Sequence, residues 1–324
     1  MSTFEQDAVA LAWGAWTELG VAGWTRTHQD WAIDPEPLIL LTAFLGDADG
    51  RLQDEATDWC VRNWRSISKV RLKNLARRAP DDARVAFGEW SATVNIHAGS
   101  SWPLATRSRR FQVTGRSSQP DLGRPSAMSL RMRALLGVGA RTEILRYMLS
   151  RQPTIFTAAT LAEATGYAKR MISDECDALV RAGLLSLRSI RNAHMYALKR
   201  RDDLESFVGG LPPLRPDWTA MSAVAIRLVQ AEREVGSSSP RTIPVKARVA
   251  LDELIPPLER LDVEVVRAVP VEELWPAVQA LGTETLGEWA RARWTDGSST
   301  TDPRDDESPG QEAALGVDSR TGRR

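Results

Sequence analysis

The chain has 324 residues, enough for two or three domains of ordinary size, and 43% of them are hydrophobic while 26% are charged. This composition excludes an acidic disordered chain, and the equal numbers of basic and acidic side chains, 42 of each, exclude a polycationic nucleic-acid coat. The charge is uneven, because residues 61–150 carry 17 basic and 5 acidic side chains whereas residues 1–60 carry 2 and 11. A polyanionic partner is therefore expected to meet the middle of the protein.

The cysteine pattern and the apolar runs predict where the protein resides. Cys60 and Cys176 lie far apart and have neither the spacing of a disulfide framework nor that of a CxxC metal site. The first ten residues lack a basic region followed by an apolar one. The longest apolar run, 37–45, is far shorter than the roughly 20 residues that span a bilayer. We expect a cytoplasmic, soluble protein that meets no membrane.

Residues 1–96 predict a helical domain rich in tryptophan. Helices are expected at 8–19, 34–45, 51–63, 66–78 and 81–96. The second begins at Asp34-Pro35-Glu36, with Asp34 as N-cap and Pro35 at the first helical position. Eight of the twelve tryptophans fall within residues 1–102. We interpret them as large pieces of a hydrophobic core, with an aromatic ligand cage as the alternative.

The remaining segments differ in composition. Residues 97–127 are rich in Ser, Gly, Pro and Arg and predict a basic linker, in which Arg107, Arg109 and Arg110 could follow phosphates. Residues 128–201 predict a separate domain, and 202–217 form a second linker rich in Gly and Pro. Residues 218–295 predict a helical C-terminal region, and 296–324 a disordered tail.

Residues 128–201 carry the pattern with the most specific meaning. Helices are expected at 141–150, 160–165 and 168–182, followed by two apolar runs at 184–190 and 194–198. Gly166 and Tyr167 predict a tight turn between the second and third helices, and Arg191-Asn192-Ala193 is a turn sequence between the two runs. This order of a helix, a helix–turn–helix and a hairpin is typical of a winged helix-turn-helix DNA-binding domain.

The same segment resembles the winged-helix regulators of the ArsR and MarR type. Across residues 139–199 their pattern is matched by Leu161-Ala162, Gly166, Ile172, Cys176, Leu179 and Gly183-Leu184. Cys176 replaces the usual leucine, so we expect a buried, unreactive thiol. The predicted fold is therefore mainly α-helical with a small β-hairpin wing, in which the winged helix lies between two helical regions. The resemblance implies a transcriptional regulator that binds double-stranded DNA.

The third helix is the predicted DNA reader. If its apolar residues pack inward, Lys169, Arg170 and Ser173 lie on the opposite face near its first turn, where a recognition helix reaches base edges. Arg170 has the geometry to bond guanine O6 and N7, and Lys169 suits a phosphate. The full set of predicted DNA-binding residues is Tyr167, Ala168, Lys169, Arg170, Ser173, Arg188, Arg191, Asn192 and His194. The last four lie on or beside the predicted wing, where they would meet the backbone or the minor groove.

Two kinds of regulator fit these features. We expect a repressor that works as a homodimer and uses no cofactor. The layout around Trp31-Ala-Ile-Asp34-Pro35-Glu36 loosely resembles winged-helix antitoxins of abortive-infection type toxin–antitoxin pairs. That resemblance implies repression of the protein's own operon and a nucleotidyltransferase-like toxin protein as partner. A repressor that responds to a small molecule is the other subtype.

A protein–protein adaptor is the alternative from another class. Winged helices also serve as docking modules, and Asp174, Glu175 and Asp177 place three acids on or near the predicted DNA reader. In an adaptor, the acidic first 60 residues would supply the contact surface. A continuous positive face would favour DNA, and its interruption by Asp174 and Asp177 would favour the adaptor.

The sequence offers no motif for catalysis. The three histidines, His28, His97 and His194, are scattered and none has a partner at metal-ligand spacing. His28 is expected at the surface. No nucleophile elbow or Cys/His pairing is apparent, so we do not expect an enzyme or a metal site.

Overall fold

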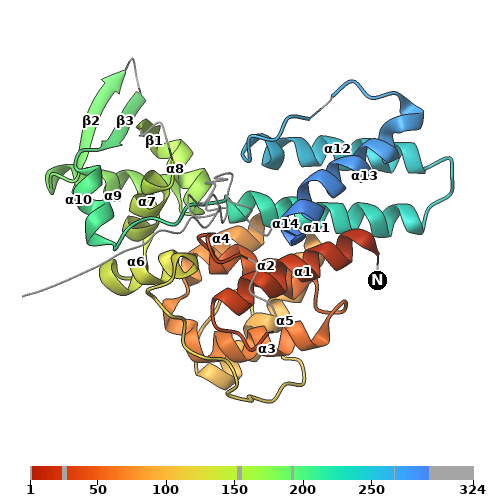
Figure 1. The fold of residues 1–324 in the computed structure, drawn as a ribbon, viewed down its shortest axis with the longest axis horizontal. Coiled ribbons are helices and arrows are strands. Elements are labelled where there is room, and N and C mark those ends of the chain that lie inside the picture. The colour runs from red at the N-terminus through yellow and green to blue at the C-terminus, as the bar shows by residue number, and fades with distance from the viewer. Residues whose placement is uncertain (1, 24–27, 152–154, 191–192, 266, 292–324) are drawn as a thin grey trace, which may run out of the picture. The chain divides into compact units, whose positions relative to one another are not determined.

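The computed structural model describes residues 2–23, 28–151, 155–190, 193–265 and 267–291. These residues are mainly helical, as predicted, and contain one small antiparallel sheet (Figure 1). The expected disordered tail, 296–324, lies outside the described residues. No helix in the described ranges combines the length and apolar character needed to cross a membrane.

The N-terminal helices follow the predicted order with small shifts at their ends. They are α1 (Thr3–Glu18), α2 (Pro35–Phe44), α3 (Gly50–Asn63), α4 (Lys69–Arg78) and α5 (Asp81–Ala98). Asp49 caps α3 by accepting from the backbone N–H of Leu52 at 2.9 Å, and Ser68 caps α4 by accepting from that of Arg71 at 3.2 Å. Asp34 precedes α2 as predicted, but its carboxylate makes no cap and instead faces arginines.

Six of the seven described N-terminal tryptophans are buried, as their interpretation as core pieces predicts, whereas Trp64 is half-buried and Trp24 lies outside the described residues. Trp16, Trp59 and Trp90 are fully buried. The rings of Trp16 and Trp59 lie with centroids 5.2 Å apart. Their indole N–H groups donate to Thr42 Oγ1 and to the carbonyl of Leu19, both at 2.8 Å, so the burial leaves neither donor unsatisfied.

The last part of the described chain returns to this core. It contains α11 (Trp218–Gly236), α12 (Ile243–Glu259), α13 (Leu274–Gly282) and α14 (Glu288–Arg291). Helix α11 packs against α1, α2 and α12, and α14 packs against α1 (Figure 1). Buried residues from both ends of the described chain belong to one hydrophobic cluster. The N-terminal and C-terminal helices are therefore held together by shared apolar burial.

Residues 97–127, predicted as a linker, pack along α3 and α5. The Asp58 carboxylate accepts from the backbone N–H groups of Thr114 and Gly115 at 2.8 and 2.9 Å. Arg109 Nη1 lies 2.5 Å from Asp54 Oδ1. The charge of Arg109 is thus paired within the protein, which does not support its predicted role on phosphates.

His28 is fully buried, so its expected surface position is wrong. Its ring lies against Trp31 with centroids 4.6 Å apart, and Nε2 is 2.9 Å from the carbonyl oxygen of Trp289. Burial lowers the pKa of His28, and the hydrogen bond to that carbonyl opposes the shift. The partner lies 261 residues away in sequence, so no local pattern indicates this site.

A second hydrophobic cluster lies around the three-stranded sheet. Its elements are α6 (Met128–Leu136), α7 (Ala140–Leu149), β1 (Ile155–Thr157), α8 (Ala158–Thr165), α9 (Lys169–Arg181), β2 (Leu185–Ile190), β3 (Ala193–Leu198) and α10 (Arg201–Phe207). The strand order is β1-β3-β2, and Tyr196 at the centre of β3 pairs with Phe156 on one side and Leu187 on the other. The apolar runs predicted the hairpin, but β1, with only three residues, was not predicted.

The two clusters are joined by a buried network of charges, here named the ionic cluster. It consists of three carboxylates and three guanidinium groups: Asp34, Glu36, Glu143, Arg71, Arg133 and Arg146. Arg133 lies 2.8 Å from Glu36 and 2.7 Å from Glu143, with its side chain 1% exposed. Because each member has at least two partners of opposite charge, the cost of removing the charges from water is offset.

The ionic cluster ties distant parts of the chain together. Asp34 directly precedes α2 and Glu36 lies in its first turn. Arg71 lies on α4, Arg133 on α6, and Glu143 and Arg146 on α7. Burial by itself would raise the pKa of Asp34, but Arg71 and Arg146 outweigh it and hold that pKa well below its usual range. Burial also opposes ionisation of Glu143, yet its arginine neighbours lower its pKa to about 2. Asp34 and Glu143 are therefore ionised near neutral pH.

Removing one guanidinium should destabilise the protein strongly. In Arg133→Met, Glu36 and Glu143 lose their shared partner, so the free energy of unfolding should fall by about 3–5 kcal/mol. Arg84→Met is the control, because Arg84 pairs with Asp81 at the surface and should cost less than about 1 kcal/mol. Urea unfolding followed by tryptophan fluorescence measures both. Equal, small effects would contradict the structural role of the ionic cluster.

The ionic cluster also predicts acid sensitivity. The pKa of Glu143 is about 2 in the folded protein against 4.5 for the free side chain, so the unfolded state binds protons more readily between these values. The stabilisation is fully present above the unfolded pKa and is lost as pH falls toward the folded one. Glu143→Gln should lower stability at neutral pH and flatten its decline on acidification, as measured by thermal unfolding across pH. An unchanged slope would show that Glu143 does not contribute.

Candidate nucleic-acid interface

The turn between α8 and α9 is built by local sequence and held by α4. Thr157 caps α8 by accepting from the backbone N–H of Thr160 at 3.1 Å. Gly166 ends the helix with φ of 76°, a left-handed conformation that favours glycine. A Cβ added to Gly166 would lie 3.3 Å from Arg71 Cγ. The glycine thus permits both the turn and its close approach to α4.

Hydrogen bonds fix this turn against α4. Arg71 Nε donates to the carbonyl of Thr165 at 2.8 Å, and Asn74 Nδ2 donates to that of Gly166 at 2.9 Å. Ser68 Oγ and the hydroxyl of Tyr167 are 2.6 Å apart. The start of α9 is therefore positioned by the N-terminal helices and by Arg71, a member of the ionic cluster.

Helix α9 has an inner and an outer face, as its periodicity predicts. Ile172, Cys176 and Leu179 are buried. Lys169 and Arg170 are exposed in the first turn, and neither has an ion-pair partner among the described residues. Met171 beside them is 41% exposed. The first turn of α9 thus presents two unpaired positive charges to solvent.

The other predicted residues of this segment occupy three different environments. Ala168 is exposed at the N-cap of α9, and Ser173 is half-buried. Tyr167 is only 3% exposed, and burial raises the pKa of its hydroxyl. Tyr167 therefore belongs to the contact with α4 and not to the exposed surface. The side chain of Tyr167, directly after the glycine, lies in the core. The sequence of the turn alone does not indicate this.

Two of the three acids of α9 have partners within the protein. Arg141 Nε donates to Glu175 Oε2 at 3.0 Å, which ties α9 to α7. The hydroxyl of Tyr196 donates to Asp177 Oδ1 at 3.1 Å. Asp174 remains exposed. Sequence reasoning could not assign these pairs, because Arg141 lies 34 residues from Glu175 and Tyr196 lies 19 from Asp177.

The hairpin does not gather its predicted residues on one face. Arg188 and His194 are both exposed. Arg188 pairs with Met195 and His194 with Ser189. Successive residues of a strand point to opposite faces, so Arg188 and His194 project from opposite sides of the hairpin. Arg191 and Asn192 lie outside the described residues.

Helix α4 carries exposed basic residues that sequence reasoning did not include in the site. Lys73, Arg77 and Arg78 are exposed on the same helix whose Asn74 binds the carbonyl of Gly166. The charge excess of residues 61–150 was the available signal, but it does not say which of the basic side chains come near α9. The docking of α4 on the turn supplies that information.

No cluster of three or more His, Cys, Asp or Glu side chains suited to a metal ion occurs among the residues described. Cys60 and Cys176 are both buried free thiols, as predicted for Cys176. Burial, with Asp177 and Glu175 nearby, raises the pKa of Cys176 to about 12. A thiol with this pKa carries almost no thiolate at neutral pH.

Cys176 should consequently resist alkylation in the folded protein. Iodoacetamide at neutral pH is expected to leave the native chain unlabelled and to label both cysteines after denaturation. Asp174→Cys provides the matched control, because position 174 is exposed on the same helix and its thiol should react readily. Mass spectrometry of the labelled peptides gives the result. Rapid labelling of native Cys176 would instead indicate a reactive, redox-responsive thiol.

Comparison with known proteins adds no further constraint on this site. No protein-family model, no curated protein and no solved structure matches the chain. What the interface binds must therefore be inferred from its own geometry and charge.

Proposed function

We propose that this protein is a sequence-specific DNA-binding regulator that reads the major groove with α9. The observation that carries the proposal is the first turn of α9, where Lys169 and Arg170 are exposed and unpaired among the described residues while the opposite face is locked into the core. An α-helix fits the major groove, and residues of its first turn reach base edges.

The order of elements supports a winged helix-turn-helix. Helix α7, strand β1, helices α8 and α9 and the hairpin β2–β3 follow one another, and the three strands form one sheet (Figure 1). In this interpretation α9 is the recognition helix and the hairpin is the wing. Arg188, which projects from one side of the hairpin, is the described wing residue best suited to a phosphate.

The roles of the α9 residues follow from their chemistry. Arg170 offers two parallel N–H donors that match guanine O6 and N7. Lys169 supplies a point charge for a phosphate, and Ser173 a hydroxyl one turn further along the helix. The free backbone N–H groups at the start of α9 add a partial positive charge that favours phosphate.

The pairing of the α9 acids favours DNA over a protein adaptor. Glu175 is neutralised by Arg141, and Asp177 accepts from a hydroxyl near the sheet. Of the three acids that argued for an adaptor, Asp174 is exposed and Asp177 half-buried, and neither has an ion pair among the residues described. The exposed positive charge of α9 is therefore confined to its first turn, because Asp174 follows Arg170 by four residues on the same side of the helix.

The regulatory role extends this proposal. A winged helix bound to a palindromic operator works as a homodimer, and repression is the simplest outcome of occupying a promoter. An autoregulating antitoxin with a toxin protein partner is one form of such a repressor. Genome-wide recovery of bound DNA identifies the operator and shows whether it precedes the protein's own gene.

The double substitution Lys169→Ala/Arg170→Ala tests the proposal on the recovered operator. Loss of one bidentate base contact and one phosphate contact should weaken specific binding by roughly 2–4 kcal/mol. The melting temperature should barely change, because both side chains are exposed. Fluorescence anisotropy with labelled operator measures the affinity.

Arg84→Ala/Arg241→Ala is the matched control, because it removes two exposed positive charges from α5 and from the residues just before α12. This control should retain sequence preference and most of the affinity. If the α9 variant binds the operator as tightly as wild type while remaining folded, α9 is not the reader.

A further inference from the structure

A cavity of about 280 Å³ lies beside α11, away from the exposed turn of α9. Its apolar walls come from Trp31, Met221, Leu261, Val263 and Trp289. These residues belong to four separate segments of the chain, so only the folded protein forms the cavity. The volume is close to the lower end of the roughly 300–1,000 Å³ found for small-molecule sites.

The turn after α12 helps to shape the cavity wall. Asp262 has φ of 57°, in the left-handed region that aspartate tolerates better than most residues. The backbone N–H groups of Leu261 and Val263 both donate to the carbonyl of Leu258. This closed turn sets the apolar side chains on either side of Asp262 against the cavity.

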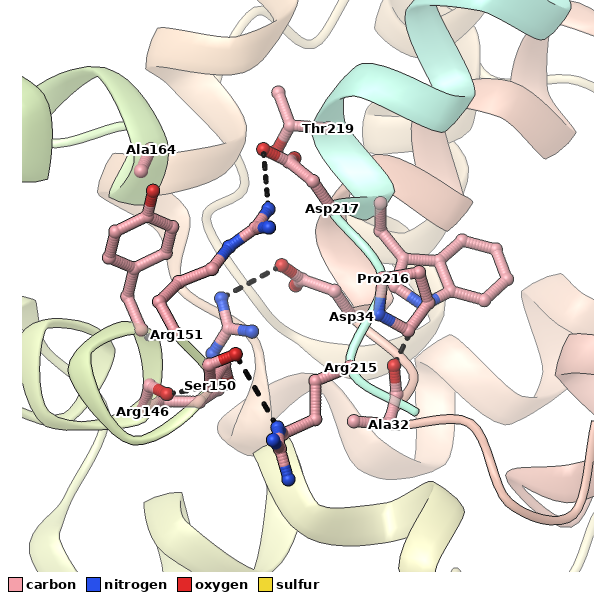
Figure 2. A pocket seen from close by; sticks show the side chains of 12 residues that line it. Ala32, Asp34, Arg146, Ser150, Arg151, Ala164, Arg215, Pro216, Asp217 and Thr219 are labelled. Atoms are coloured by element: carbon pink, nitrogen blue, oxygen red, sulfur yellow. Dashed lines mark hydrogen bonds and ion pairs between the residues drawn. The ribbon is translucent and has the colours of Figure 1, made fainter. Parts of the chain in front are cut away.

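One end of the cavity is positively charged. Arg151, Arg215, Pro216 and Asp217 line both this cavity and a smaller one of about 20 Å³ that reaches Arg146 and α7. Figure 2 shows Arg151 reaching toward Asp217 and Arg215 reaching toward Ser150, with Asp34 between the two arginines. The polar end of the larger cavity therefore opens toward the ionic cluster.

Arg215 has no carboxylate partner among the described residues. It donates to the carbonyl of Pro212 at 2.9 Å and lies 3.5 Å from that of Ser150. Burial lowers the pKa of Arg215. The positive charges of Arg201 and Arg151 lower it further, while the negative charge of Glu205 raises it. A guanidinium held near two other cations favours an anion as its neighbour.

The carboxylate of Asp217 does not neutralise this end. Its Oδ1 accepts from the backbone N–H of Ala220 at 3.1 Å, where it caps α11, and its Oδ2 accepts from Arg260 at 2.6 Å. Arg151 is 4.0 Å away, beyond hydrogen-bond distance. The charge of Asp217 is therefore already paired by Arg260, and the positive charge of Arg215 remains.

We propose that this cavity is a binding site for a small amphipathic anion. The apolar body of the ligand lies against Trp31, Trp289 and Leu261, and its carboxylate accepts hydrogen bonds from Arg215 and Arg151. Aromatic walls and a charged end select an aromatic or medium-chain aliphatic carboxylate over a neutral molecule of the same shape. The proposal does not rest on the proposed DNA contacts, because none of the lining residues lies on α9.

Calorimetric titration of the full-length protein without DNA tests the proposal. The probes are 2-naphthoate and octanoate, with 2-naphthamide as the uncharged match of the first. We expect 2-naphthoate to bind and the amide to bind at least about tenfold more weakly, because the amide lacks the charge that pairs with the arginines. The proposal is overturned if neither acid binds at millimolar concentration, or if acid and amide bind equally well.

Variants locate the binding. Arg215→Gln should weaken 2-naphthoate by about tenfold, and Leu261→Trp should abolish binding by filling the cavity. Arg241→Gln, an exposed arginine outside the lining, should bind as wild type. Thermal unfolding checks that each variant is folded. If Leu261→Trp does not fold, the affinity of Arg215→Gln for 2-naphthoate tests the site by itself. Wild-type affinity in Arg215→Gln would overturn the assignment, whatever the result of DNA binding.

Discussion

The buried ionic cluster is the constraint on which the rest of the structure depends. Arg71 and Arg133 are almost inaccessible to water. Each must form ion pairs with carboxylates, because an unpaired buried charge would destabilise the folded state. Those carboxylates come from the start of α2 and from α7. The N-terminal helices and the segment that contains α9 therefore fold against each other in one arrangement, because another arrangement would separate buried opposite charges.

This arrangement explains how α9 is presented. Arg71 also donates to the carbonyl of Thr165, and its neighbour Asn74 to that of Gly166, so the ionic cluster extends to the turn before α9. The tryptophan-rich helices are thus part of the support for the candidate interface. Helix α4, which holds the turn before α9, also carries exposed basic residues, and these account for part of the positive charge in the middle of the sequence.

Helix α7 contacts both the smaller cavity and α9. Its Arg146, Tyr147 and the following Ser150 line the smaller cavity, and α9 packs against the same helix. Arg146 also belongs to the ionic cluster through Asp34 and Glu143. A ligand at the charged end of the cavity would lie close to groups whose positions also fix α9.

The sequence by itself determined most of the helices, the glycine turn before α9 and the buried face formed by Ile172, Cys176 and Leu179. These features depend on propensity and periodicity over a few residues, which are local properties. It also indicated the hairpin, but not the short strand β1, whose three residues carry no periodicity of their own. It did not predict α6, or α10, most of which falls in the segment 202–217 that was predicted as a linker.

Tertiary structure alone decided which charges meet. The sequence predicts Asp34 as a helix cap, but its carboxylate binds Arg71, 37 residues away. His28 was expected at the surface, but it is buried and lies against Trp289, 261 residues away. Tyr167 was predicted at the DNA-binding surface, but it is buried, and its hydroxyl meets that of Ser68 at the N-cap of α4. A buried charge or polar group takes the partner that the topology brings close, and that choice is set by packing between segments that no local pattern relates.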